Sequence, residues 1–125
     1  MERPGLRAGM KTYCLALDIR DELGLMEQYR WYHLPENFWP EVTQIIHSQG
    51  ILSEEIYLAG NRMVMILQTT DDFSLEAKAA ADQANPIMQQ WETLMWNYQK
   101  PLPEAKPGQK WVLMEKIFEL SKPAI

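Results

Sequence analysis

The sequence predicts an α+β domain of the ferredoxin-like type, a split βαβ arrangement in which helices cover one face of an antiparallel sheet. Three observations indicate this fold. Apolar residues alternate with a period of two near the start of the chain, in two adjacent central segments and near the end. Helical spacing separates these segments, so the order is strand, helices, strand, strand, helices, strand. A chain of 125 residues suits one such domain.

The first strand is expected over residues 12–19, where apolar and polar residues alternate. A helix should follow, with Asp21 as its N-cap and His33 near its end. Proline disfavours helical backbone in the residue before it, so the Leu34-Pro35 step predicts a break.

A second helix is expected from Pro40, because proline is favourable at the first helical position, and Gly50 supplies its end. Two strands, over residues 53–59 and 62–69, come next. Gly60-Asn61 between them tolerates the positive φ angles of a tight hairpin, so these strands should be antiparallel neighbours.

The second helical region is expected to begin at Ser74 and to restart at Asn85-Pro86, a capping residue followed by a proline. Residues 100–108 contain three prolines and should form a loop. Alternation returns over residues 111–120 and predicts a last strand. The sheet face without helices would still carry large apolar side chains, which a monomer rarely exposes, so we expect a homodimer through the sheet face.

Composition excludes several classes of partner and site. A net charge of −5 gives no attraction for phosphate backbones, so nucleic acid is not an expected partner. Cys14 is the only cysteine, which excludes an intrachain disulfide and a cysteine-based zinc site, and no metal site is expected. No apolar run approaches the ~20 residues of a membrane span, and no signal-peptide pattern is present. We expect a cytoplasmic protein, with residues 1–10 as an N-terminal arm or an added extension and residues 11–125 as a single domain.

Polar aromatic residues stand out within the apolar elements. Tyr29 and His33 are four residues apart, so a phenol and an imidazole share one helix face. An imidazole with an ordinary pKa near 6.5 is suited to proton transfer at neutral pH. The alternative is a structural histidine bonded to a backbone carbonyl, and the spacing does not decide between the two.

Four further residues are candidates for a ligand site. Tyr57 and Trp91 can bind a ligand hydroxyl or stack on a sugar ring, although tyrosine and tryptophan more often serve as core rings. Glu92 and Glu115 can act as an acid/base partner. Glu115 falls on the apolar side of the last expected strand, where an unpaired carboxylate is costly to bury. Motifs for phosphate loops, dinucleotide binding, zinc proteolysis and serine hydrolysis are absent.

Several segments together resemble the L-rhamnose mutarotase family, over nearly the whole chain from Lys11 to Leu120. In chain order they are Glu27–His33 (EQYRWYH), Trp39–Val42 (WPEV), Glu55–Arg62 (EIYLAGNR), Asn85–Glu92 (NPIMQQWE) and Trp111–Phe118 (WVLMEKIF). The resemblance implies a dimeric α/β barrel that interconverts the α and β anomers of a 6-deoxy-L-hexose, L-rhamnose or L-fucose, with no metal or organic cofactor.

The resemblance also implies roles for the site residues. His33 would be the proton donor, and Tyr29 and Tyr57 would bind sugar hydroxyls. Trp91 would contact the ring as the first member of an aromatic pair whose second position here holds Glu92, which leaves the sugar open. Opening the ring needs one acid and one base. The opposing base is expected to be Glu92 or Glu115.

A different class of function fits the same fold. Dimeric ferredoxin-like barrels also include small monooxygenases and modules that bind ligands without catalysis, and a fold does not fix a function. Thermal stabilisation by deoxy sugars, as against haem, flavin or aromatic compounds, separates the two hypotheses because only a true ligand stabilises the folded state.

Overall fold

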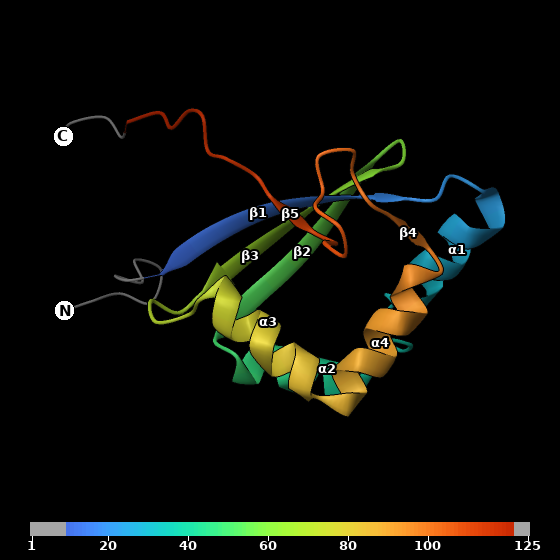
Figure 1. The fold of residues 1–125 in the computed structure, drawn as a ribbon, viewed down its shortest axis with the longest axis horizontal. Helices are drawn as coiled ribbons and strands as arrows, with labels where there is room; N and C mark the ends of the chain where they lie inside the picture. Colours follow the sequence, from blue (N-terminus) through green and yellow to red (C-terminus); the bar gives the residue numbers. More distant parts are fainter. Residues whose placement is uncertain (1–9, 122–125) are drawn as a thin grey trace.

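The computed structural model describes residues 10–121, and all but the last residue of the expected N-terminal arm lies outside that range. Figure 1 shows the helices gathered on one side of the sheet. The antiparallel α+β fold expected from the sequence is confirmed. The elements are β1 (Lys11–Ile19), α1 (Leu23–Tyr32), α2 (Pro40–Ser48), β2 (Ile51–Ala59), β3 (Arg62–Thr69), α3 (Leu75–Ala84), α4 (Pro86–Trp96), β4 (Gln99–Lys100) and β5 (Val112–Leu113).

The sheet has the order β2-β3-β1-β4, and β5 also pairs with β1. All of these pairings are antiparallel. Since β3 takes one edge of β1, the two short strands share the other, opposite Asp18–Ile19 for β4 and Leu15–Ala16 for β5. The sequence placed Lys100 in a loop because a strand of two residues is too short to show a period of two.

The prediction of a strand over residues 111–120 is wrong for most of its length. Only Val112–Leu113 is paired, and one further bond joins the Met114 amide to the Cys14 carbonyl at 2.7 Å. Beyond it the chain leaves the sheet on the side away from the helices (Figure 1). Alternation indicates an extended chain, but a strand also needs a neighbour, and no strand among residues 10–121 pairs with residues 115–121.

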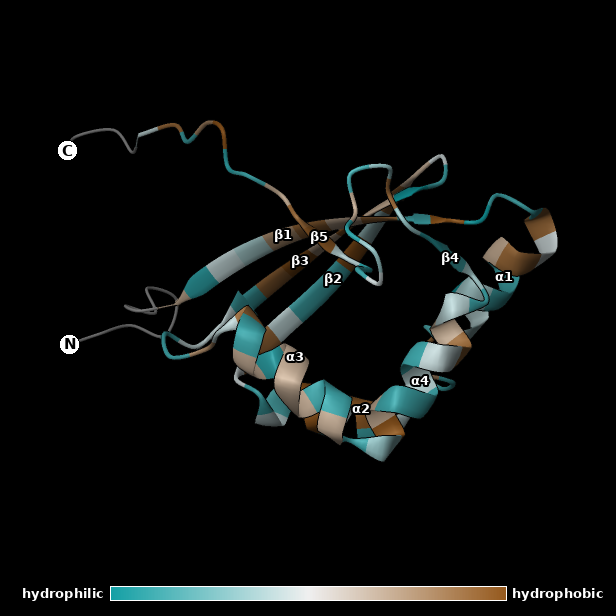
Figure 2. Cartoon of the chain, viewed as in Figure 1, coloured by the Kyte–Doolittle hydropathy of each residue, from teal (hydrophilic) through white to brown (hydrophobic). Residues whose placement is uncertain are grey.

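The core lies between the sheet and the helices. Odd-numbered residues of β1 and β3 face the helices, and Leu17, Ile19 and Met63 are each at most 1% exposed. They pack on Tyr29 of α1 and on side chains of α2 and α4. Figure 2 shows apolar stretches on β3 and on parts of the helices that pack against the sheet.

A bulge in β2 sets which of its side chains face this core. Ile51 pairs with Thr69 while Ser53 pairs with Gln68, so Leu52 is an extra residue. A shift of one residue moves all following side chains to the other face. From here on the even-numbered residues of β2, beginning with Glu54, face the helices.

The helix ends follow the sequence closely, with one exception. The side chains of Ser74 and Asn85 accept hydrogen bonds from the backbone at the starts of α3 and α4, as expected. Glu22, not Asp21, is the N-cap of α1, and its side chain makes no capping bond. Gly50 has a φ of +93°, and a Cβ there would lie 2.7 Å from Thr70 Oγ1. Within residues 10–121, the helices are too short or too polar to cross a membrane.

Candidate active site

A cavity of about 620 Å³ lies between the sheet and the helices. Four of the six residues that the sequence selected line it together: Tyr29, His33, Trp91 and Glu92. Charged and polar residues that the sequence did not select line it as well, among them Glu54, Lys78, Asp82, Gln99 and Lys110. The volume is typical of a small-molecule site.

His33 ends α1 and is half-buried. Its Nδ1 lies 2.7 Å from the carbonyl oxygen of Tyr29. Because a carbonyl only accepts, Nδ1 carries the proton, and Nε2 of the neutral ring keeps a lone pair. Burial lowers the pKa of His33, and the bond to the Tyr29 carbonyl opposes this. The imidazole is therefore neutral at neutral pH and can accept a proton through Nε2.

Aromatic rings surround this imidazole. The ring centroid of His33 lies 4.3 Å from that of Tyr29, 5.7 Å from that of Phe38 and 5.6 Å from that of Trp91. Trp91 itself contacts Phe38 and Trp39 edge to face. Such apolar faces can stack on the C–H face of a sugar ring and keep water away from the reacting atoms.

Tyr29 presents its hydroxyl deep in the site. Gln99 Nε2 donates a hydrogen bond to Tyr29 Oη at 3.2 Å. Burial is the main cause that raises the pKa of Tyr29 to about 12; the Gln99 bond lowers it and the charge of Glu54 raises it. The phenol stays protonated at physiological pH, and since Gln99 occupies it as an acceptor, its own proton is free for a ligand.

Glu54 is a site residue that the sequence reasoning missed. It follows the bulge of β2, faces the helices and is half-buried. Burial raises the pKa of its carboxyl, the Lys78 ammonium lowers it and the Asp82 carboxylate raises it. The available signal was its period-two spacing with Ile56, because a carboxylate on the apolar face of a strand points to a special environment.

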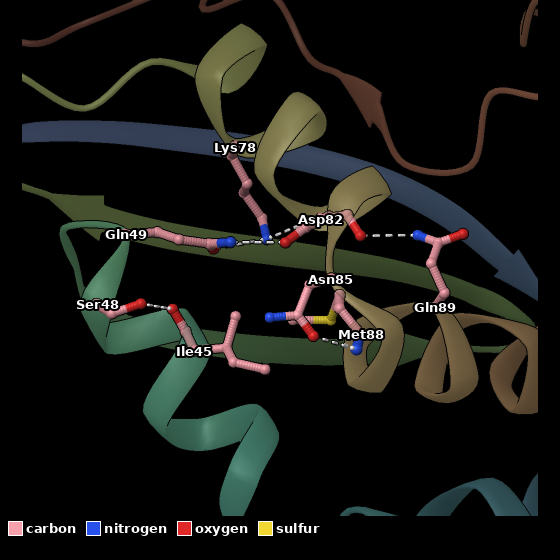
Figure 3. A network of polar contacts seen from close by, with 8 residues as sticks. All are labelled: Ile45, Ser48, Gln49, Lys78, Asp82, Asn85, Met88 and Gln89. Carbon is pink, nitrogen blue, oxygen red and sulfur yellow. Dashed lines mark hydrogen bonds and ion pairs between the residues drawn. The ribbon is translucent and has the colours of Figure 1, made fainter.

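A network of hydrogen bonds connects the charged residues Lys78 and Asp82 in the cavity wall (Figure 3). Lys78 Nζ donates to Asp82 Oδ2 at 2.8 Å and to Gln49 Oε1 at 3.1 Å. Gln49 Nε2 donates to Asp82 Oδ1 at 2.6 Å, and Gln89 Nε2 donates to the Asp82 carbonyl at 2.9 Å. Asp82, which is 7% exposed, is thus fully bonded, and the network ties α2, α3 and α4 together.

Glu92 borders the cavity beside Lys110. Lys110 Nζ donates to the Glu92 carbonyl at 3.0 Å and lies 4.9 Å from the centre of the Trp96 ring. Burial lowers the pKa of Lys110 to about 8, and the Glu92 charge opposes this. The carboxylate of Glu92 is therefore electrostatically coupled to Lys110.

Two of the sequence-selected residues lie elsewhere. Tyr57 is 57% exposed on the sheet face opposite the cavity, because the bulge turns the odd-numbered residues of β2 outward. Glu115 is exposed, beyond the end of β5, and does not border the cavity. The expectation that it lies buried in a strand is wrong, because that part of the chain has left the sheet. Within the described range, no cluster of three or more His, Cys, Asp or Glu residues is arranged to hold a metal ion.

Comparison with known proteins identifies the family of this chain. The family model described as "L-rhamnose mutarotase" matches residues 12–120. The chain belongs to the L-rhamnose mutarotase family. It is 42% identical to an L-fucose mutarotase of Xanthomonas campestris over 113 residues, which is 90% of each chain.

Two solved structures share the fold of this family member. The L-rhamnose mutarotase of Formosa agariphila superposes with a TM-score of 0.65 at 16% identity, covering 89% of this chain and 99% of the other. The tetracenomycin F2 cyclase of Streptomyces glaucescens gives a TM-score of 0.59 at 11% identity, covering 90% and 99%. A mutarotase and a polyketide cyclase thus share one scaffold, so the side chains of the cavity must decide the chemistry.

Proposed function

We propose that the protein is a mutarotase that interconverts the α and β anomers of a 6-deoxy-L-hexose by proton transfer between His33, Glu54 and the sugar. The observation that carries the proposal is the placement of a neutral imidazole, with its Nε2 lone pair free, in the same aromatic-walled cavity as a half-buried carboxyl group. Both groups also line an adjoining cavity of about 390 Å³ beside α2 and β2, so they lie at the junction of the two spaces.

The reaction needs one proton acceptor and one proton donor. A base removes the proton of the anomeric hydroxyl while an acid protonates the ring oxygen, and the ring opens to an aldehyde; closure on the other carbonyl face reverses both transfers. Burial lowers the pKa of His33 and raises the pKa of Glu54, so their affinities for a proton approach one another. A pair that shares one proton can supply either role in each direction.

Glu54 replaces Glu92 and Glu115 as the opposing acid/base group. Its charge acts on Tyr29, which stacks on His33, whereas the charge of Glu92 acts on Lys110. His33, expected as the proton donor, thus begins as the acceptor in its neutral form and becomes the donor when the ring closes.

Tyr29 and Trp91 would bind the sugar. The Tyr29 hydroxyl can donate to a sugar hydroxyl, and the Trp91 ring can stack on the apolar face that the 6-methyl group extends. We propose L-fucose as the preferred sugar, because the Xanthomonas campestris relative that is 42% identical is an L-fucose mutarotase. The proton transfers use side chains alone, so we propose that no cofactor is needed.

The direct test is exchange or saturation-transfer NMR of the anomeric protons of L-fucose and L-rhamnose. The protein should raise the rate of anomer exchange well above the buffer rate, faster for L-fucose than for L-rhamnose. A rate equal to that of buffer alone for both sugars would contradict the proposal and favour a module that only binds its ligand.

A homodimer through the sheet is part of the same proposal. The outer sheet face presents Tyr57, and the chain beyond β5 carries Ile117, Phe118 and Leu120, which are 89%, 75% and 79% exposed. Figure 2 shows apolar stretches along the segment beyond β5, which lies clear of the sheet and the helices. A second copy packed on this face would cover both the outer sheet face and the apolar segment beyond β5, and would close the α/β barrel. With its single cysteine reduced, the dimer would work in the cytoplasm.

A further inference from the structure

One polar atom of the cavity wall has no partner. Gln99, in β4, is 3% exposed and lines the cavity. Its Nε2 is engaged by Tyr29, whereas Oε1 makes no hydrogen bond. In the part of the chain that the structure describes, Oε1 is the one buried side-chain nitrogen or oxygen atom in this condition. A buried acceptor without a donor lowers the stability of a folded protein, so its retention calls for an explanation.

We infer that Gln99 and Tyr29 together bind one ring hydroxyl of the sugar and make the protein selective for sugars that carry it. This inference rests on the proposed function. The amide offers an acceptor, Oε1, and the phenol offers a proton that Gln99 leaves free. One hydroxyl can donate to the first and accept from the second, so the pair matches a hydroxyl in both of its roles.

The position of the pair suits this role. Tyr29 stacks on His33 at 4.3 Å between ring centres, so a hydroxyl held by Tyr29 lies close to the reacting end of the sugar. The last torsion of a glutamine side chain is broad, so the amide plane can adjust to a ligand. L-Fucose and L-rhamnose differ in configuration at C2 and C4, so a fixed hydroxyl site of this kind can distinguish them.

Backbone pairing keeps the amide in place. Gln99 pairs with Ile19 of β1, whose side chain is 1% exposed in the core. The chain then leaves the sheet in a loop that returns to the cavity at residues 108–111, so this short strand anchors the start of the loop beside the cavity. A residue on a paired strand is held more accurately than one on a free loop.

The test compares Gln99→Met with the wild type on L-fucose and on its 2-, 3- and 4-deoxy derivatives. In the wild type, removing the bound hydroxyl should lower kcat/KM about tenfold or more, and removing either of the others should have little effect. In Gln99→Met, kcat/KM for L-fucose should fall to the value for that one deoxy sugar, so that the two sugars are no longer distinguished. The pH profile should keep its shape, because His33 and Glu54 are untouched.

Two variants complete the experiment. Gln44→Met, on the exposed face of α2, should behave as the wild type. Gln99→Asn keeps the amide but withdraws it by one methylene, so it should fold and lose part of the discrimination for the same hydroxyl only. Equal losses on all four sugars, or unchanged discrimination in both Gln99 variants, would overturn the inference.

The outcome is separable from that of the proposed function. If the wild type does not accelerate anomer exchange, the mutarotase proposal fails. The melting temperature with each sugar still tests the hydroxyl site, because a ligand that binds the folded state raises it. If anomer exchange is fast and Gln99→Met shows the wild-type pattern, only the hydroxyl site is wrong.

Discussion

The two faces of the sheet are built for different tasks. The inner face, with the helices over it, brings His33, Tyr29 and Glu54 of one chain to the wall of a single cavity. The outer face presents Tyr57, and the segment beyond β5 exposes apolar side chains that the described part of the chain leaves uncovered. Glu54 and Tyr57 lie on the same strand, three residues apart, and face opposite sides. One chain alone thus supplies the chemical groups of the cavity, and we propose that a second copy covers the outer face.

The largest effect is expected at His33, on the inner face. Replacing it with alanine removes an acid/base group and should lower kcat/KM by about 10²- to 10⁴-fold. His47→Ala is the matched control, because His47 also bonds a backbone carbonyl, that of Ile51, through Nδ1 at 3.0 Å. Anomer exchange measured by NMR gives both rates. Equal losses in the two variants would show that His33 acts only through the fold.

Glu54→Gln should cause the next largest loss of activity. The amide keeps the shape of the carboxyl but cannot exchange a proton with the sugar, so kcat should fall about 10²-fold or more while the fold is retained. Glu55→Gln changes the neighbouring residue, which is exposed on the outer face, and should retain activity. If Glu55→Gln were the impaired variant, the orientation of β2 after its bulge would be wrong.

The same variant makes a prediction about stability. Burial raises the pKa of Glu54 in the folded protein. The contribution of this group to the free energy of unfolding is therefore fully present below its pKa in the unfolded chain, near 4.5, and is lost as pH rises through its pKa in the folded protein. Glutamine does not titrate. Glu54→Gln should therefore melt at a higher temperature than the wild type at pH 8, and the difference should shrink as pH falls toward 4.5. Differential scanning calorimetry across this range tests the sign, with Glu55→Gln as the reference.

The sequence was sufficient to predict most of the fold and the Tyr29–His33 pair of the cavity, but not Glu54. Periodicity and capping residues located the long strands and the helices, and the spacing of Tyr29 and His33 identified one wall of the cavity. The sequence could not predict which side of the sheet each β2 side chain faces. A single bulge at Leu52 decides whether Tyr57 or Glu54 points toward the helices. For this reason Tyr57, which was expected to bind a sugar hydroxyl, lies outside the cavity. The error at Glu115 has another cause, since alternation does not tell whether a partner strand exists.

The outer face yields a prediction about assembly. Phe118→Asp places a charge in the apolar segment beyond β5. At micromolar concentration it should convert the proposed dimer to a monomer, because a buried unpaired charge opposes association. Multi-angle light scattering during gel filtration measures the mass of each variant. Glu119→Asp, the adjacent exposed position, should remain dimeric. A monomeric wild type would remove the proposed role of this face.

The smallest effect separates the two tyrosines. Tyr29→Phe removes the hydroxyl that Gln99 engages in the cavity and should lower kcat/KM about tenfold, the value of one hydrogen bond to a ligand. Tyr57→Phe removes a hydroxyl whose contact, with Glu55 at 3.4 Å, lies on the exposed face, and its effect should stay within about twofold. Because the two variants make the same chemical change, any difference in sugar turnover reports the face on which each ring lies. A larger loss for Tyr57→Phe would mean that the outer face also contributes to a sugar site, and the division between chemistry and assembly would then have to be abandoned.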